Sequence, residues 1–261
     1  MMQSDSSPKW TWSNETKIRI FALPLCILLT FLFHQLSYLA SVYRLLVGSL
    51  VHELGHAFAY WLSSRAAIPT HIFFTIVFSP SFSLITFLFV TLVTGYLCWK
   101  VYSTGHRGLL YVLGTFYSLF LTCTALFSDN TASLVGVAGG FAGELLLSSF
   151  FICSFFYLHH PRPWWTWALL FIGTNALVDS TDLWYRVWRG SKELPFGSFL
   201  FGDSHGDLNT LMESFSLSRE VIVQLYGGLA LFSLSLVLAH YFTLGVLGFG
   251  DSSQEDEAKG F

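Results

Sequence analysis

Residues 52–56 read His-Glu-Leu-Gly-His, an H-E-x-x-H motif that lies in apolar sequence. His52 and His56 are four residues apart, so on a helix their imidazoles project from one face and can hold one metal ion. Glu53 lies one position further round, where its carboxylate can reach a water on that ion without becoming a ligand. Zinc lowers the pKa of such a water from about 15.7 to about 7. The motif therefore predicts zinc-assisted hydrolysis, with Glu53 as a catalytic residue.

The surroundings of this motif are those of a membrane segment. Leu, Val, Ala and Phe fill most of positions 45–59, and Gly55 keeps one side of the helix thin. Three ionisable groups in such a segment are costly to desolvate, so we expect them to face a protein interior or a wet cavity and to serve a function. The alternative is a polar cluster with a purely structural role.

Composition places the chain among integral, multi-pass membrane proteins. Hydrophobic residues make up 53% of the 261 positions and charged residues 11%, whereas a soluble domain has about 25% charged residues. The net charge of −3, without a basic block, argues against nucleic acid as a partner. We recognise no cleavable signal peptide, so we expect the first apolar segment to be retained. The four cysteines lie singly in apolar stretches and predict neither disulfides nor a cysteine zinc site.

Apolar segments of about 20 residues, the length that crosses a bilayer, recur along the chain. We expect helices at residues 18–40, 43–63, 82–99, 108–127, 133–158, 164–185 and 220–247. Residues 66–81 are bounded by proline and rich in β-branched and aromatic residues, which favours an extended or re-entrant segment. The sequence therefore predicts an all-α polytopic membrane protein of about six to seven transmembrane helices, with a small β element after the second.

The chain is expected to form one integral-membrane domain. This domain covers residues 1–250, and residues 251–261 form an acidic tail that we expect to be disordered. The distribution of Lys and Arg slightly favours a cytosolic N-terminus.

A catalytic zinc site has three protein ligands and one open position, so a third ligand must come from elsewhere in the chain. The apolar segment 169–184 ends with two carboxylates, Asp179 and Asp182, which share a helical face, and Asn175 lies one turn earlier. Either aspartate is a candidate ligand. The alternative is that the helix simply ends there, with Asp182 and Arg186 forming an exposed i, i+4 pair.

Glu144 is a further carboxylate within apolar sequence. The glycines at 139, 140 and 143 precede it and allow another helix or an extended substrate to approach the backbone closely. Glu144 is a candidate metal ligand, a partner for another polar group, or the start of the buried part of its helix.

The loop at residues 202–207 also carries metal-binding residue types. They are Asp203, His205 and Asp207. Loops with this composition are more often turns, so the loop remains a secondary candidate.

These features resemble the site-2-protease family of intramembrane zinc metallopeptidases, in a short branch without a PDZ domain. The resemblance rests on H-E-L-G-H in an early membrane helix, a strand-like segment after it, the glycines at 139–143, and a late Asn and Asp. In that family an Asp about eight residues after the Asn, within Leu-Asp-Gly, is the third zinc ligand. The resemblance therefore implies His52, His56 and Asp182 as ligands, with Asp179 as the alternative. Here Asp182 follows Asn175 by seven residues, and Leu183 stands in place of the glycine.

The resemblance implies a zinc-dependent endopeptidase that hydrolyses membrane-embedded or membrane-proximal substrates. Glu53 would take a proton from the attacking water and pass it to the leaving amine, and Asn175 would orient the substrate or stabilise the oxyanion. The scissile bond must be non-helical, because helical carbonyls are already hydrogen-bonded. Strand addition to residues 70–78 would hold the substrate extended. The implied cofactor is Zn²⁺, and the implied partners are a membrane-protein substrate and the lipid bilayer.

Two other classes of function remain open. A catalytically inactive metal-binding membrane scaffold would need the two histidines but not Glu53, so the presence of Glu53 favours the enzyme. A multispan ion or solute transporter would use Glu144, Asp179 and Asp182 as an ion path. The sequence shows no internal repeat that would support such a transporter.

Overall fold

The computed structural model describes residues 14–70, 74–103, 107–157, 164–196 and 206–247. Within these ranges helices dominate, and one two-stranded sheet interrupts them. In chain order the elements are α1 (Asn14–His34), α2 (Ser37–Tyr43), the π-helix η1 (Arg44–Gly48), α3 (Ser49–Trp61), β1 (Arg65–Pro69), β2 (Thr75–Phe82), α4 (Leu84–Ser103), α5 (Arg107–Leu126), α6 (Asp129–Tyr157), α7 (Trp164–Trp188), α8 (Asp207–Glu213), α9 (Arg219–His240) and the π-helix η2 (Tyr241–Leu247). The predicted helical architecture and the small β element are confirmed. The predicted acidic tail lies outside the described residues.

Four helical segments are long and apolar enough to cross a membrane. They are Lys17–His34, Leu84–Ser103, Asp129–Tyr157 and Arg219–Val246, and a shorter apolar helix covers Leu110–Leu126. Large apolar side chains on their outer faces are exposed in the isolated chain, among them Ile85 at 82% and Leu92 at 70%. Such extensive apolar exposure is expected of helices that face lipid. The structure is thus consistent with the predicted membrane protein.

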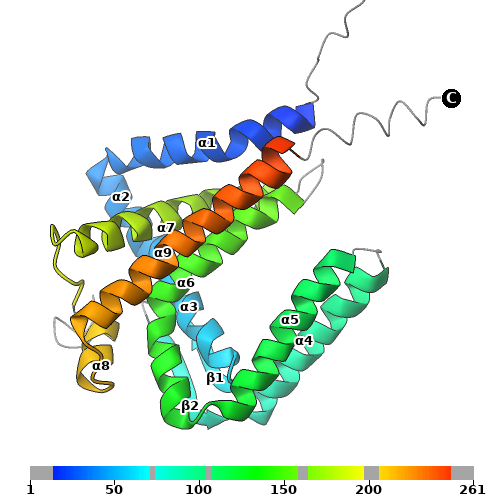
Figure 1. Cartoon of the computed structure of the whole chain (residues 1–261), viewed down its shortest axis with the longest axis vertical. Helices are drawn as coiled ribbons and strands as arrows, with labels where there is room; N and C mark the ends of the chain where they lie inside the picture. The colour runs from blue at the N-terminus through cyan, green and yellow to red at the C-terminus, as the bar shows by residue number, and fades with distance from the viewer. Residues whose placement is uncertain (1–13, 71–73, 104–106, 158–163, 197–205, 248–261) are drawn as a thin grey trace, which may run out of the picture.

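α6 is the central helix of the fold and contacts α3, α7, α8 and α9 (Figure 1). The largest side chains buried among these helices include Phe155, Trp184 and Tyr226. Trp184 of α7 stacks on Tyr226 of α9 with 4.5 Å between the ring centroids. Tyr226 donates its hydroxyl to the carbonyl of Ala138 in α6, at 3.1 Å. This core fixes α7 and α9 against the part of α6 that faces α3.

α3 crosses α6 at a contact built from glycines. A Cβ atom on Gly55 would overlap the backbone of Gly139 and Gly143, and one on Gly143 would overlap the backbone of Gly55. Only small residues allow two helix backbones to come this close. A Cβ atom on Gly140 would overlap the Nε2 atoms of both motif histidines. The glycines of α6 therefore position α3 and leave space in front of its histidines.

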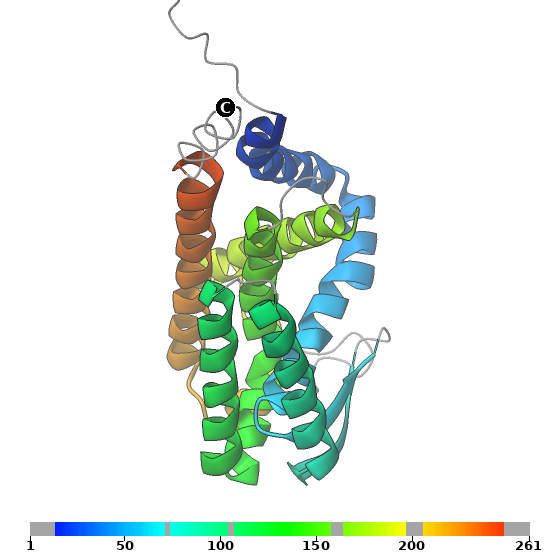
Figure 2. The same cartoon turned by 90° about the vertical axis from the view of Figure 1, so that its right-hand side faces the viewer.

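A β-hairpin follows α3 and leads into α4 (Figure 2). The strands are antiparallel, with Pro69 opposite Thr75. β1 lies against α3, where Trp61 donates its indole N–H to the carbonyl of Ala67 at 2.8 Å. Within the described residues β2 has β1 as its only strand partner.

α4 and α5 form a helical hairpin that diverges from the other helices (Figures 1 and 2). At its base the buried guanidinium of Arg65 donates to the carbonyl of Pro80 and to the carboxylate of Asp129, both at 2.8 Å. Arg65 thereby ties β1 to β2 and to the first turn of α6. This connection holds the β-hairpin beside the α3–α6 crossing.

Candidate metal centre

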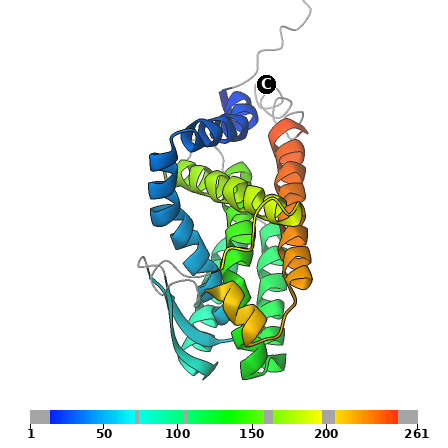
Figure 3. The ribbon, with the colours of Figure 1, turned by 90° about the vertical axis from the view of Figure 1, so that its left-hand side faces the viewer.

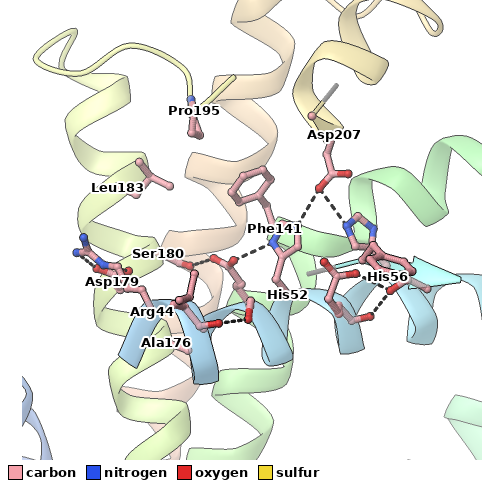
Figure 4. A pocket seen from close by; sticks show the side chains of 18 of the residues that line it. Arg44, His52, His56, Phe141, Ala176, Asp179, Ser180, Leu183, Pro195 and Asp207 are labelled. Atoms are coloured by element: carbon pink, nitrogen blue, oxygen red, sulfur yellow. Dashed lines mark hydrogen bonds and ion pairs between the residues drawn. The ribbon is translucent and has the colours of Figure 1, made fainter. Parts of the chain in front are cut away.

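His52 and His56 project from one face of α3 toward α8, which lies on α6 (Figures 3 and 4). The Nε2 atom of His52 lies 2.8 Å from Oδ2 of Asp207, and the Nε2 atom of His56 lies 3.0 Å from the same oxygen. Two imidazole nitrogens and one carboxylate oxygen thus meet at one point. These are the ligand types of a catalytic zinc site, in which two histidines and one carboxylate leave a fourth position open.

The distances from the Asp207 oxygen to the two imidazole nitrogens are close to those of a zinc site. Zinc ligands lie about 2.0–2.2 Å from the metal, so neighbouring ligand atoms in a tetrahedral site are about 3.3 Å apart. The observed separations of 2.8 and 3.0 Å are only a few tenths of an ångström shorter. His52, Glu53 and His56 also form a group whose ligand atoms all lie within 4.8 Å of one another. A small outward shift of Asp207 would therefore make room for the ion.

Both histidine rings are held by a hydrogen bond at Nδ1, the ring nitrogen that does not face Asp207. Nδ1 of His56 donates to the backbone carbonyl of Gly136, and Nδ1 of His52 donates to Oε1 of Glu144, each at 2.8 Å. With zinc bound, a proton kept on Nδ1 would leave the lone pair of Nε2 for the metal, on the side of the ring that faces Asp207. Phe141 packs edge-on against His52, with 4.8 Å between the ring centroids. The two imidazoles are therefore oriented as ligands.

Asp207 is the first residue of α8, which contacts α6 and whose Leu208 and Leu211 are fully buried. Asn209 accepts the backbone N–H of Gly206 at 3.2 Å and so stabilises the first turn. Burial alone would raise the pKa of the Asp207 carboxyl, but the imidazoles of His56 and His52 hold that pKa well below its usual range. Asp207 is therefore a carboxylate at neutral pH.

Glu53 is buried, belongs to the same group as the two histidines, and contacts the first residue of β2. The hydroxyl of Thr75, the first residue of β2, lies 2.7 Å from Oε2 of Glu53 and 2.9 Å from its backbone carbonyl. A hydroxyl that donates to the carboxylate restricts its rotation. The carboxylate is thus placed next to the strand edge along which an extended chain can lie.

The structure places the two aspartates of α7 in ion pairs. Asp182 is exposed and pairs with Arg186 at 2.9 Å, as the alternative for this helix end predicted. Asp179 accepts two hydrogen bonds from Arg44, one of them 2.7 Å long. The carboxylate in contact with both motif histidines belongs to Asp207. This contact makes Asp207 a candidate third ligand beside the predicted Asp182 and its alternative Asp179.

The remaining predicted residues have other surroundings. Asn175 is fully buried, and its side-chain amide donates to the carbonyl of Phe171 in its own helix at 2.9 Å. Its neighbour Ala176 lines the cavity in front of the histidines, whereas Asn175 does not. This placement gives no support to a role for Asn175 on substrate. Asp203 and His205 lie outside the described residues.

The candidate centre lies in a cavity of about 860 Å³ (Figure 4). Residues spaced by four along η1 and α3, from Arg44 through His52 to Tyr60, line it together. In a regular α-helix, side chains four positions apart differ in direction by roughly 40° around the helix axis. This difference accumulates along the chain, so Arg44 and Tyr60 would point to different sides of a regular helix. The wider π turn of η1 counteracts this drift. The cavity therefore extends beyond the histidines in both directions.

Sequence reasoning ranked Asp207 below the aspartates of α7. Only a weak pattern in the sequence points to Asp207. Leu208 and Leu211 form an apolar i, i+3 pair directly after a polar loop, which predicts a short helix with one buried face. Comparisons with protein-family models, curated proteins and solved structures find no match to this chain.

Proposed function

We propose that this protein is a zinc-dependent endopeptidase that cleaves membrane-embedded or membrane-proximal polypeptides. His52, His56 and Asp207 would hold the ion, and Glu53 would act as the general base. The proposal depends chiefly on the convergence of both Nε2 atoms on one Asp207 oxygen, with a buried carboxylate beside them. A protein that only stored or sensed metal would have no need of Glu53.

Zinc, when bound, lowers the pKa of a coordinated water to about 7 and polarises a carbonyl oxygen. Glu53 accepts a proton from the attacking water and delivers it to the nitrogen of the leaving amine as the peptide bond breaks. Thr75 keeps the Glu53 carboxylate in place during both transfers. The immediate products are a carboxylic acid and an amine, so the one proton that Glu53 transfers balances this step. At neutral pH the new acid then loses its remaining proton to the new amine or to water.

A substrate must be extended at the scissile bond, because the carbonyls of a helix are already hydrogen-bonded. The free edge of β2 offers backbone groups for such a strand. Thr75 and Val77 of β2 line the cavity that contains the two histidines. An extended chain added to this edge would therefore run past Glu53.

We also propose six membrane crossings, which are α1, α4, α5, α6, α7 and α9. α7 starts at exposed Trp164 and ends at exposed Trp188, and aromatic residues at both ends are typical of membrane interfaces. Its 25 residues span about 37 Å, enough for the hydrocarbon region. Ser180, beside the candidate centre, lies about 12 Å from the end of α7. This depth favours substrates that enter from within the bilayer.

The proposal is tested on the full-length protein purified in detergent and reconstituted in lipid. We expect about one zinc per chain and cleavage of a fluorescent transmembrane peptide library. The double variant His52→Ala/His56→Ala should lose both, and removal of zinc by a chelator should stop cleavage until zinc is restored. Zinc content that survives the double substitution would place the metal elsewhere. Stoichiometric zinc without any peptide cleavage would favour the metal-binding scaffold.

The transporter alternative gains no support from the carboxylates that it requires. Glu144 contacts His52 and Ser180, Asp179 contacts Arg44, and Asp182 contacts Arg186. Each carboxylate is thus engaged by its own partners.

A further inference from the structure

The two motif histidines are held in chemically different ways. His56 donates its Nδ1 proton to a neutral backbone carbonyl, that of Gly136, whereas His52 donates to the carboxylate of Glu144, at the same distance of 2.8 Å. A charged acceptor makes the stronger hydrogen bond and increases the basicity of the ring. His52 is therefore the imidazole whose ligand strength depends on another ionisable side chain.

Glu144 occupies an unusual position for a carboxylate. It lies in the middle of α6, within a segment apolar enough to cross a membrane, and its side chain is only 17% exposed. One of its oxygens accepts from His52, and the other accepts the hydroxyl of Ser180 in α7. Ser180 is itself 2% exposed. A buried carboxylate is tolerated when such donors satisfy it, so this pair of contacts explains its presence.

Glu144 cannot serve as the third ligand in this arrangement. It binds Nδ1 of His52, whereas Asp207 binds Nε2, which lies on the opposite side of the imidazole ring. Its carboxylate therefore faces the back of the ring, away from the point where the two Nε2 atoms meet. Glu144 acts on the centre through His52.

We propose that Glu144 is a positioning residue for the metal centre, and that Ser180 holds it in place. By accepting the Nδ1 proton, Glu144 fixes the tautomer and the angle of the His52 ring and directs Nε2 toward the ion. Glu144 belongs to α6 and Ser180 to α7. The orientation of His52 on α3 therefore depends on both of these helices. This inference rests on the proposed zinc site formed by His52, His56 and Asp207.

The test uses Glu144→Gln in the full-length protein, with Glu213→Gln as a matched carboxylate-to-amide control at the exposed end of α8. Zinc affinity is measured by competition with a chromogenic chelator, and ligand geometry by the visible spectrum of the Co²⁺-substituted protein. Loss of the outer partner of a metal-bound histidine typically costs about 10–100-fold in affinity. We expect a decrease of that size with an altered cobalt spectrum for Glu144→Gln, and wild-type values for Glu213→Gln.

Ser180→Ala provides a second, milder variant, with Ser149→Ala as the control because that buried serine bonds to Leu145 in its own helix. We expect Ser180→Ala to change the cobalt spectrum and to reduce zinc affinity severalfold. If Glu144→Gln does not fold, Ser180→Ala decides the question. Unchanged affinity and spectrum in the folded variants would overturn the positioning role and leave the zinc site intact. A wild-type protein that binds no zinc would instead overturn the proposed function itself.

Discussion

Oδ2 of Asp207 lies 2.8 Å from Nε2 of His52, although the two residues are 155 positions apart in the chain. His52 belongs to α3 and Asp207 to α8, and both helices are held on α6. One contact therefore unites the H-E-x-x-H helix with the segment after α7. This contact identifies Asp207 as the residue to test first.

Asp207→Ala should remove zinc from the protein. A tetrahedral site with two histidines needs one carboxylate, and no other described carboxylate contacts both Nε2 atoms. We expect zinc per chain to fall from about one to near zero, as measured by atomic emission on desalted protein. Asp182→Ala and Asp179→Ala should keep their zinc, because Arg186 and Arg44 are their partners. Zinc loss in Asp182→Ala with retention in Asp207→Ala would restore the assignment from the family resemblance.

Glu53→Gln should retain zinc and lose cleavage. The amide keeps the shape of the side chain but cannot accept a proton from water, and general acid–base catalysis contributes about 10²–10⁴-fold. We expect kcat for a transmembrane peptide to fall by that factor with zinc per chain unchanged. A variant that cleaves at the wild-type rate would show that Glu53 is not the base.

The sequence predicted the long helices well, because runs of about 20 apolar residues directly indicate membrane helices. The segment expected at 133–158 corresponds to α6, Asp129–Tyr157. The extended segment expected at 66–81 covers all but one residue of β1, Arg65–Pro69, and of β2, Thr75–Phe82. The four-residue spacing of His52 and His56 likewise placed both rings on one face. These features depend on local patterns, which a single sequence contains.

The third ligand depends on packing between distant elements, which the sequence does not display. Helical spacing places Asp179 and Asp182 on one face but does not say what that face meets. In the structure α7 turns Ala176 and Ser180 to the cavity, and Asp182 is left exposed. Asp207 belongs to a helix of only seven residues, too short for a clear periodic signal.

Thr75→Val should slow cleavage without removing zinc. The substitution keeps the β-branched shape but removes the hydroxyl that lies 2.7 Å from Glu53. Loss of one such hydrogen bond costs about 1 kcal/mol, which is roughly a fivefold change in rate. We expect kcat to fall by that amount, while Thr75→Ser, which keeps the hydroxyl, stays near wild type. An equal loss in both variants would point to packing of β2 as the cause.

Gly143→Ala should destabilise the α3–α6 crossing and the metal centre together. The added Cβ would overlap the backbone of Gly55, which cannot move aside as a side chain can. Overpacking of this kind costs about 1–3 kcal/mol of unfolding free energy. Gly95→Ala in α4 is the control, since nothing lies within 4 Å of its Cβ position. We expect a lower midpoint of thermal unfolding and weaker zinc binding for Gly143→Ala only.

The proposed six crossings predict which chain positions share a face of the membrane. α5 separates Ser103 from Asn130, and α6 and α7 separate Asn130 from Lys192. Single cysteines at Asn130 and Lys192 should therefore react from the same side of sealed vesicles with an impermeant maleimide, and a cysteine at Ser103 from the opposite side. The unsubstituted chain, whose cysteines at 26, 123 and 153 are buried, sets the background. Labelling of Ser103 and Asn130 from one side would show that α5 does not cross. Labelling of Asn130 and Lys192 from opposite sides would show that only one of α6 and α7 crosses.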